Sequence, residues 1–203
     1  MKSLLLIAAF CAVFVGCNSQ EKTADSTVLK TASKPAEITE NSLYNLDGVW
    51  KDEKGRDVVL KSLLGKPRII TMFYSTCTFA CPKTIGDMKA IQAGLTEAEQ
   101  KNLSFMLFSF DPARDTPERL DTVARDMDLK ETEWQLLTAD ESNVQELAAV
   151  TNIQYKDMKT GDFSHSNTIL ILDKNGEIVH RQEGIGSDPK ASIAVLKKLI
   201  AEN

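Results

Sequence analysis

The stretch that decides the fold reads RIITMFYSTCTFACP and runs from Arg68 to Pro82. Its first part, residues 68–74, is rich in β-branched and aromatic residues, which predicts a buried strand. Two cysteines follow in the spacing Cys-x-x-x-Cys, at Cys77 and Cys81. Apolar residues then recur at helical spacing over residues 82–93, which predicts a helix. We therefore expect the cysteines at a turn between a buried strand and the N-terminus of a helix.

The rest of the chain alternates between short apolar runs and amphipathic helical patterns. Further strands are predicted at residues 103–110, 167–172 and 177–181, and further helices that begin at 115–118, span 141–150 and begin at 188–189. Runs at 43–46 and 58–60 flank a turn-rich segment and predict a small hairpin. Strand, cysteine-bearing turn, helix, strand, helix, strand hairpin and helix is the order of the thioredoxin fold. We predict an α/β protein with a thioredoxin-like fold and an added N-terminal β-hairpin.

The charge of the chain excludes one broad class of function. Its 203 residues include 29 acidic and 24 basic side chains, for a formal net charge of −5. A nucleic-acid-binding protein needs a basic face to neutralise phosphates, so no nucleic-acid partner is expected. The hydrophobic fraction of 42% is that of a folded protein and argues against a fully disordered chain.

The first seventeen residues have the pattern of an export signal. Lys2 precedes an apolar run over residues 4–15, which is shorter than the roughly 20 residues that a membrane-spanning helix needs. The first seventeen residues end in Phe-Val-Gly-Cys, which resembles a bacterial lipobox, although Phe14 stands where leucine is usual. We predict a lipoprotein signal peptide over residues 1–17, with Cys17 lipidated after cleavage. An uncleaved anchor and an ordinary signal peptide are the alternatives.

The segment after the signal has the composition of a linker. Residues 18–41 contain no aromatic residue and many Ser, Thr, Glu and Lys, which predicts a flexible tether. The folded domain is expected over residues 42–203. With its lipid on Cys17, the protein is expected to be exported and anchored to the surface of a bacterial membrane, facing the periplasm or the cell exterior.

The cysteine count leaves one pair for chemistry. Cys11 leaves with the signal and Cys17 carries lipid, so Cys77 and Cys81 remain as thiols in an oxidising compartment. Residues four apart on a helical turn have Cβ atoms roughly 5–6 Å apart, which suits a disulfide or one soft metal ion. A purely structural disulfide over so short a loop would stabilise the fold little, but that reading and two inert thiols stay open.

The number of ligands favours copper among the soft metals. Two thiolates suit Cu(I) and zinc, but a closed structural zinc site needs four protein ligands. Copper with two thiolates and one imidazole is the better fit, and the chain has two histidines, His165 and His180. His180 lies in the predicted outer strand of a hairpin. His165 lies in a polar loop before the strand at 167–172, and in thioredoxin folds this segment passes beside the cysteine turn. We predict His165 as the third ligand.

Three motifs are spread over residues 42–203. Cys-x-x-x-Cys-Pro ends at Pro82, Asp-Pro-x-x-Asp-Thr-Pro occupies residues 111–117, and a histidine at His165 precedes an Asp-x-x-Gly turn at residues 173–176. Together these motifs resemble the SCO/SenC family, whose members are membrane-tethered thioredoxin-fold proteins linked to copper delivery and to assembly of the copper-A centre of cytochrome c oxidase.

The resemblance implies roles for particular residues. It makes Cys77, Cys81 and His165 the copper ligands, and it gives Asp111 an electrostatic supporting role, with a loop acceptor for backbone N–H groups as the alternative. Residues 115–116 are expected to cap the helix that follows. The chain also departs from the family, because Phe79 stands between the cysteines where an acidic residue is common.

Two functions follow from this set of residues. The first is a copper-binding metallochaperone that assists copper-A assembly, with a cytochrome c oxidase subunit or another copper protein as partner. The second is an enzyme, a thiol–disulfide oxidoreductase that reduces the cysteines of such a partner, in which Cys77 attacks and Cys81 resolves the mixed disulfide. A peroxidase of the peroxiredoxin kind is disfavoured, because residues 73–76 lack the proline that its active-site motif requires.

Overall fold

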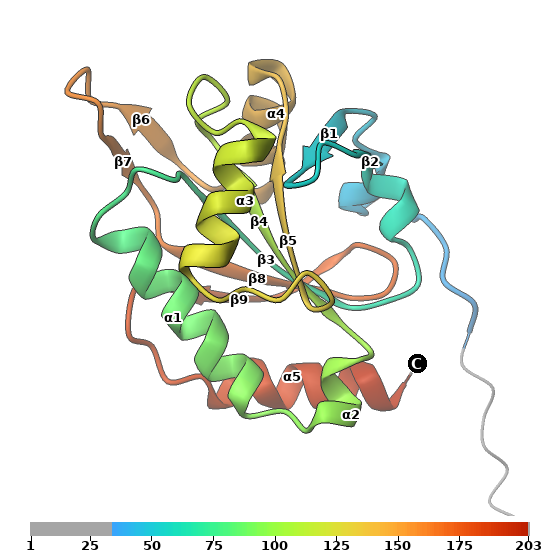
Figure 1. Cartoon of the computed structure of the whole chain (residues 1–203). Helices are drawn as coiled ribbons and strands as arrows, with labels where there is room; N and C mark the ends of the chain where they lie inside the picture. The colour runs from blue at the N-terminus through green and yellow to red at the C-terminus, as the bar shows by residue number, and fades with distance from the viewer. Residues whose placement is uncertain (1–33, 203) are drawn as a thin grey trace, which may run out of the picture. The chain divides into compact units, whose positions relative to one another are not determined.

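A seven-stranded mixed sheet forms the centre of the domain, in a computed structural model that describes residues 34–202 (Figure 1). The strands lie in the order β2-β1-β5-β4-β3-β8-β9. Their bounds are Val49–Asp52 for β1, Asp57–Val59 for β2, Arg68–Phe73 for β3, Ser104–Ser109 for β4, Trp134–Thr138 for β5, Thr168–Leu172 for β8 and Ile178–Glu183 for β9. A separate pair of strands, hereafter the ribbon, consists of β6 (Tyr155–Asp157) and β7 (Phe163–His165).

The helices connect and cover these strands. They are α1 (Ala80–Ala93), α2 (Glu97–Gln100), α3 (Pro117–Asp126), α4 (Glu141–Thr151) and α5 (Lys190–Ala201), with the 3-10 helices η1 (Leu43–Asn45) and η2 (Leu60–Leu63). β3 and β4 are parallel, as are β4 and β5. The two crossovers step in the same direction along the sheet, so α1 and α3 cover the same face, as Figure 1 shows. Helix α5 packs against α1 and β9.

The centre of the sheet confirms the predicted thioredoxin-like architecture. Every residue of β3 and of β8 is buried, as expected for strands covered on both faces. The predicted helix after the cysteines is α1, which begins at Ala80, and the predicted cap at Thr116 is formed, since its side chain accepts from the N–H of Arg119. β3 therefore delivers the chain to the cysteines at the start of α1.

The N-terminal hairpin is present, but its first strand was wrongly placed. It pairs β1 with β2, whereas residues 43–45 form the helix η1. Ser42 explains the difference, because its side chain accepts from the N–H of Tyr44 and caps this turn. Leu43 and Tyr44 are buried here without strand pairing. The hairpin extends the sheet at β5, to which β1 pairs.

Two further strand regions escaped prediction. Strand β5 is a largely buried five-residue strand between β1 and β4, and its short apolar run does not distinguish a strand from a helix. The polar loop predicted around His165 is instead the strand β7, paired with β6 so that Tyr155 faces His165. A three-residue polar strand has no local hydrophobic pattern, because it is formed by its partner strand and by the packing of its aromatic residues.

The described end of the predicted tether contacts the domain. The N–H of Glu37 donates to the Asn175 side chain, and the Thr39 hydroxyl donates to Glu177, both at the turn between β8 and β9. The predicted signal peptide, Cys17 and residues 18–33 lie outside the described residues. Within residues 34–202, none of the helices has the length and apolar character needed to cross a bilayer.

Candidate metal centre

The cysteine loop joins the end of β3 to the start of α1, and hydrogen bonds to Tyr74 and Asp115 hold it in place. The N–H of Cys77 donates to the carbonyl of Tyr74 at 3.3 Å. The N–H of Ser75 donates to the carboxylate of Asp115 at 3.1 Å, and the Ser109 hydroxyl donates to the same carboxylate at 2.5 Å. Asp115 was predicted to cap a helix, but it is fully buried and ties the cysteine loop to β4 instead. Thr116 alone provides the cap.

The two cysteines are close but differ in exposure. The N–H of Cys81 donates to the Cys77 sulfur at 3.2 Å, because Cys81 lies in the first turn of α1 and its amide points back along the helix. Cys77 is half-buried and Cys81 is buried, and both are free thiols. A reagent or a partner protein can therefore reach the Cys77 sulfur more readily than the Cys81 sulfur.

The same contacts separate the acidities of the two thiols. A hydrogen bond from the Cys81 thiol, helped by the N–H groups of Cys81 and Phe79 and opposed by burial, lowers the pKa of Cys77 to about 4. That hydrogen bond and burial raise the pKa of Cys81. At neutral pH the pair therefore consists of a Cys77 thiolate and a Cys81 thiol. The thiolate is the form that attacks disulfides and binds metals.

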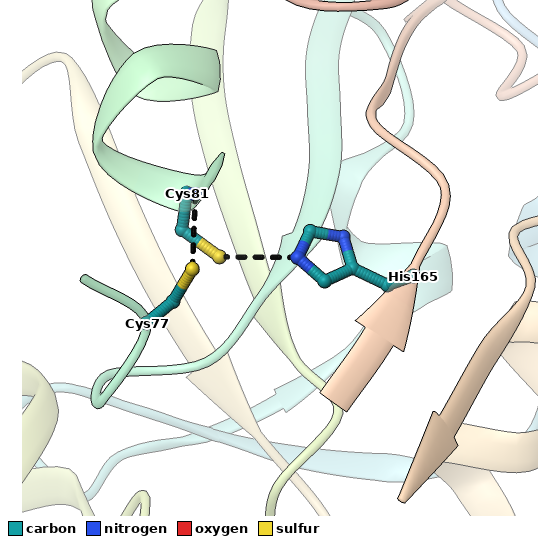
Figure 2. Close-up of side chains that lie close together, drawn as sticks. All are labelled: Cys77, Cys81 and His165. Atoms are coloured by element: carbon teal, nitrogen blue, oxygen red, sulfur yellow. Dashed lines mark hydrogen bonds between the residues drawn. The ribbon is translucent and has the colours of Figure 1, made fainter. Parts of the chain in front are cut away.

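His165 reaches the cysteines from the ribbon, and Figure 2 shows its ring pointing at the sulfur of Cys81. The ring nitrogen Nε2 lies 3.8 Å from the Cys81 sulfur, and Nδ1 lies 3.1 Å from the carbonyl of Ser166. A carbonyl can only accept, so Nδ1 carries the proton of the neutral ring. The lone pair on Nε2 is then directed at the sulfurs.

The three ligand atoms suit a single metal ion. The sulfurs of Cys77 and Cys81 and a ring nitrogen of His165 all lie within 4.8 Å of one another. In a trigonal site, a metal bound to a thiolate at about 2.3 Å and to an imidazole at about 2.0–2.1 Å holds these donors about 3.7–3.8 Å apart. The 3.8 Å between Nε2 and the Cys81 sulfur matches that separation. Among residues 34–202, no fourth cysteine, histidine or carboxylate joins this group, so a closed four-ligand zinc site is not formed there.

Asp111 lies outside this group of ligands. It is buried, and its carboxylate accepts a hydrogen bond from Nε of Arg114, three residues along the chain. Nη1 of Arg114 donates in turn to the carbonyl of Gly161 at 2.6 Å, at the turn of the ribbon. Asp111 therefore contacts the ribbon through Arg114, which was not singled out in the sequence.

Aromatic residues around His165 were also missed as part of the site. The rings of Tyr74 and Phe110 lie 5.9 and 5.2 Å from the imidazole, and Phe163 and Tyr155 complete the cluster. One signal was available in the sequence, because Phe163 stands two residues before His165 and so shares its face of a strand. Met72, Met106, Trp50 and Trp134 are buried residues of the hydrophobic core.

Phe79 projects from the loop between the two cysteines. It is 64% exposed, and Nζ of Lys83 lies 4.0 Å from the centre of its ring. The segment between the cysteines therefore presents an apolar ring and a neighbouring cation beside the half-buried Cys77.

These features define a thioredoxin-fold protein whose dithiol and imidazole converge at the start of α1. The model of the SCO1/SenC family matches residues 41–201, and the chain belongs to this family.

Known relatives agree with this assignment. The SCO1 protein homolog of Bacillus subtilis is 24% identical over 143 residues, which make up 69% of this chain and 74% of the relative. The crystal structure of a SCO1/SenC family lipoprotein from Bacillus anthracis has a TM-score of 0.69 at 20% identity and covers 83% of this chain and 98% of that one. Copper-bound ScoI from Bradyrhizobium japonicum has a TM-score of 0.64 at 24% identity, with 75% and 96% covered. The two structures confirm the predicted fold.

Proposed function

We propose that this chain is a lipid-anchored copper carrier that binds one copper ion through Cys77, Cys81 and His165. The observation that carries the proposal is the convergence of the three ligand atoms within 4.8 Å. Two thiolates and an imidazole are a donor set that Cu(I) favours. The copper in ScoI, which has the same fold, supports copper as the cargo.

Delivery would proceed by exchange of ligands. Cys77 is the more accessible sulfur, so a donor atom of the partner meets the ion on this side while Cys81 and His165 still hold it. Replacement of the three ligands one after another lets the ion pass without being released to water. The membership of the SCO1/SenC family supports the copper-A centre of cytochrome c oxidase as the destination.

A copper titration of the reduced full-length protein tests this function. The parent is expected to bind one equivalent of Cu(I) in competition with a chelator. Cys77→Ala and Cys81→Ala should lose this binding, and His165→Ala should weaken it roughly tenfold or more. His180→Ala is the matched control, since His180 lies on β9 and is not one of the three ligands. Equal Cu(I) affinity of His165→Ala and the parent would mean that the imidazole is not a copper ligand.

The lipid anchor is a proposal of its own, placed on Cys17. The lipobox-like end of the apolar run supports it, and the Bacillus anthracis relative of the same fold is a lipoprotein. When the parent is expressed in bacteria, it should partition into the detergent phase and be labelled by a radioactive fatty acid. Its folded domain should face the periplasm or the cell exterior. Cys17→Ser should lose the label, whereas Cys11→Ser should retain it.

A second function, thiol–disulfide exchange, is favoured by the unequal acidity of the two thiols. The Cys77 thiolate would attack a disulfide of the partner, forming a mixed disulfide and releasing one partner thiolate. Cys81 would then lose its proton and attack the Cys77 sulfur, which releases the second partner thiolate. The partner is reduced and the Cys77–Cys81 pair is oxidised to a disulfide.

A trapping experiment separates this function from copper delivery. The probe is the soluble copper-A domain of the host's own oxidase, with its two cysteines oxidised. Cys81→Ser should accumulate a mixed disulfide through Cys77, while Cys77→Ser should not. Absence of any mixed disulfide, together with copper transfer by the parent, would leave delivery as the function of the pair.

A further inference from the structure

The ribbon that carries His165 is held to the domain by few contacts of its backbone. β6 and β7 pair with each other and belong to a sheet separate from the seven-stranded one. One backbone contact with the domain is the N–H of Phe163, which donates at 3.4 Å to the hydroxyl of Tyr74, the residue after β3. The position of His165 therefore depends on how the ribbon as a whole is fixed.

Arg114 supplies a charged contact at the far end of this ribbon. Its Nη1 donates to the carbonyl of Gly161 at 2.6 Å, in the turn between β6 and β7. Its guanidinium also lies 5.6 Å from the centre of the Phe163 ring and 5.8 Å from that of Tyr74. One side chain thus contacts the turn of the ribbon, the ring of Phe163 and the ring of Tyr74, which follows β3.

Asp111 fixes the direction of that side chain. Its carboxylate, which is only 6% exposed, pairs with Nε of Arg114. Arg114 itself is 36% exposed, so without this partner its long side chain would be free to point into solvent. With Nε committed to Asp111, the planar guanidinium presents Nη1 to Gly161.

Fixing Phe163 also fixes His165. The two residues are two positions apart in β7, so their side chains lie on the same face. Both pack on one ring, with Phe163 and His165 each 5.2 Å from Phe110. A displacement of the ribbon that withdraws Phe163 from Phe110 must withdraw the imidazole from the cysteines as well.

We infer that Arg114, braced by Asp111, is the positioning residue that keeps the ribbon closed over the cysteines and so keeps His165 within reach of a bound ion. This role of Arg114 deepens the proposed copper-carrier function. Only the copper measurements below depend on that function, and the exchange experiment does not. The role predicts that the third ligand can be released, with both thiolates in place, by removing a side chain that is not itself a ligand.

The first test uses the metal-free, reduced full-length protein and measures amide hydrogen exchange. In Arg114→Met, the amides of β6 and β7 should exchange at least tenfold faster than in the parent, while those of β3 and β4 keep their rates. Arg125→Met is the matched control, because Arg125 pairs with Asp121 on the exposed side of α3. An unchanged ribbon would overturn the inference, and so would equal acceleration throughout the domain. If Arg114→Met fails to fold, Arg114→Lys carries the test, with the same expected direction.

The second test measures Cu(I) affinity and the number of nitrogen ligands. Loss of a residue that orients a metal ligand typically costs about 10- to 100-fold in affinity, and Arg114→Met should fall in that range. The nitrogen coupling from His165 in the electron paramagnetic resonance spectrum of the Cu(II) form should decrease together with the Cu(I) affinity. The double variant Arg114→Met/His165→Ala should bind no more weakly than His165→Ala alone.

The copper outcomes are distinguishable. Additive losses in the double variant, or a full nitrogen signal in Arg114→Met, would overturn the positioning role. Failure of the parent to bind copper would overturn the proposed function, while the exchange experiment would still decide whether Arg114 holds the ribbon.

Discussion

The two halves of the site are held in different ways. The cysteine loop lies between a central strand and the first turn of α1, and the buried carboxylate of Asp115 ties it to β4. His165 lies on a two-stranded ribbon outside the main sheet, held by aromatic packing and by Arg114. One half is part of the core, and the other is attached to it.

The two halves therefore fix two different distances within the site. Cys77 lies in the loop just before α1 and Cys81 in its first turn, and the N–H of Cys81 donates to the Cys77 sulfur, so contacts between residues close in the sequence set the distance between the sulfurs. The distance from the imidazole to the sulfurs is set by contacts between distant parts of the chain. Local openings of such peripheral elements cost less free energy than global unfolding. The ribbon is therefore the half of the site that can open while the fold stays intact.

The largest expected effect comes from the residue on which the ribbon packs. Phe110 is 2% exposed and contacts Tyr74, Tyr155, Phe163 and His165. Phe110→Ala would leave a cavity where both halves meet and should lower the free energy of unfolding by about 3–5 kcal/mol. Urea denaturation of the reduced protein measures this.

The exposed phenylalanine of the site provides the control. Phe79→Ala removes a ring that is 64% exposed, and it should change the free energy of unfolding by less than about 0.5 kcal/mol. A loss in Phe110→Ala as small as this would mean that the aromatic cluster does not attach the ribbon.

The difference between the halves also explains what the sequence could reveal. The cysteine half is encoded locally, since a buried strand, a Cys-x-x-x-Cys spacing and a helical pattern follow one another within 26 residues, 68–93. The histidine half is not. Selecting His165 required knowledge of the path of the fold, and apart from the spacing of Phe163 and His165 the sequence indicates neither the ribbon nor its contact with Arg114.

Asp115 is a second residue whose place in the structure could not be predicted from the sequence. The sequence Asp-Thr-Pro favours a helix cap, and Thr116 does form one. The side chain of Asp115 is buried instead, where its carboxylate accepts hydrogen bonds from the N–H of Ser75 and the hydroxyl of Ser109. Only the pairing of β3 with β4 brings these two donors together.

The second prediction concerns the acidity of the cysteine half. Because the pKa of Cys77 is lowered to about 4, its thiolate is present throughout the range from pH 5 to pH 7. Alkylation of Cys77 should therefore change little over this range, whereas an ordinary thiol with a pKa of about 8.5 gains about a hundredfold in thiolate. Mass spectrometry of iodoacetamide-treated protein measures the rate at each cysteine. The urea-unfolded protein is the control, and an equally steep pH dependence before and after unfolding would contradict the lowered pKa.

The smallest expected effect comes from a single hydroxyl that joins the two halves. Tyr74→Phe keeps the ring that packs on Phe110 and removes the oxygen that accepts from the N–H of Phe163. Burial raises the pKa of Tyr74 to about 12, so the hydroxyl keeps its proton and the substitution removes no charge at neutral pH. A loss of about 1 kcal/mol is expected, seen as roughly fivefold faster exchange of the Phe163 amide. Tyr155→Phe removes a hydroxyl from the ribbon itself and should leave that amide unchanged. Equal exchange rates in the two variants would mean that the ribbon is held by its rings and by Arg114 without help from the Tyr74 hydroxyl.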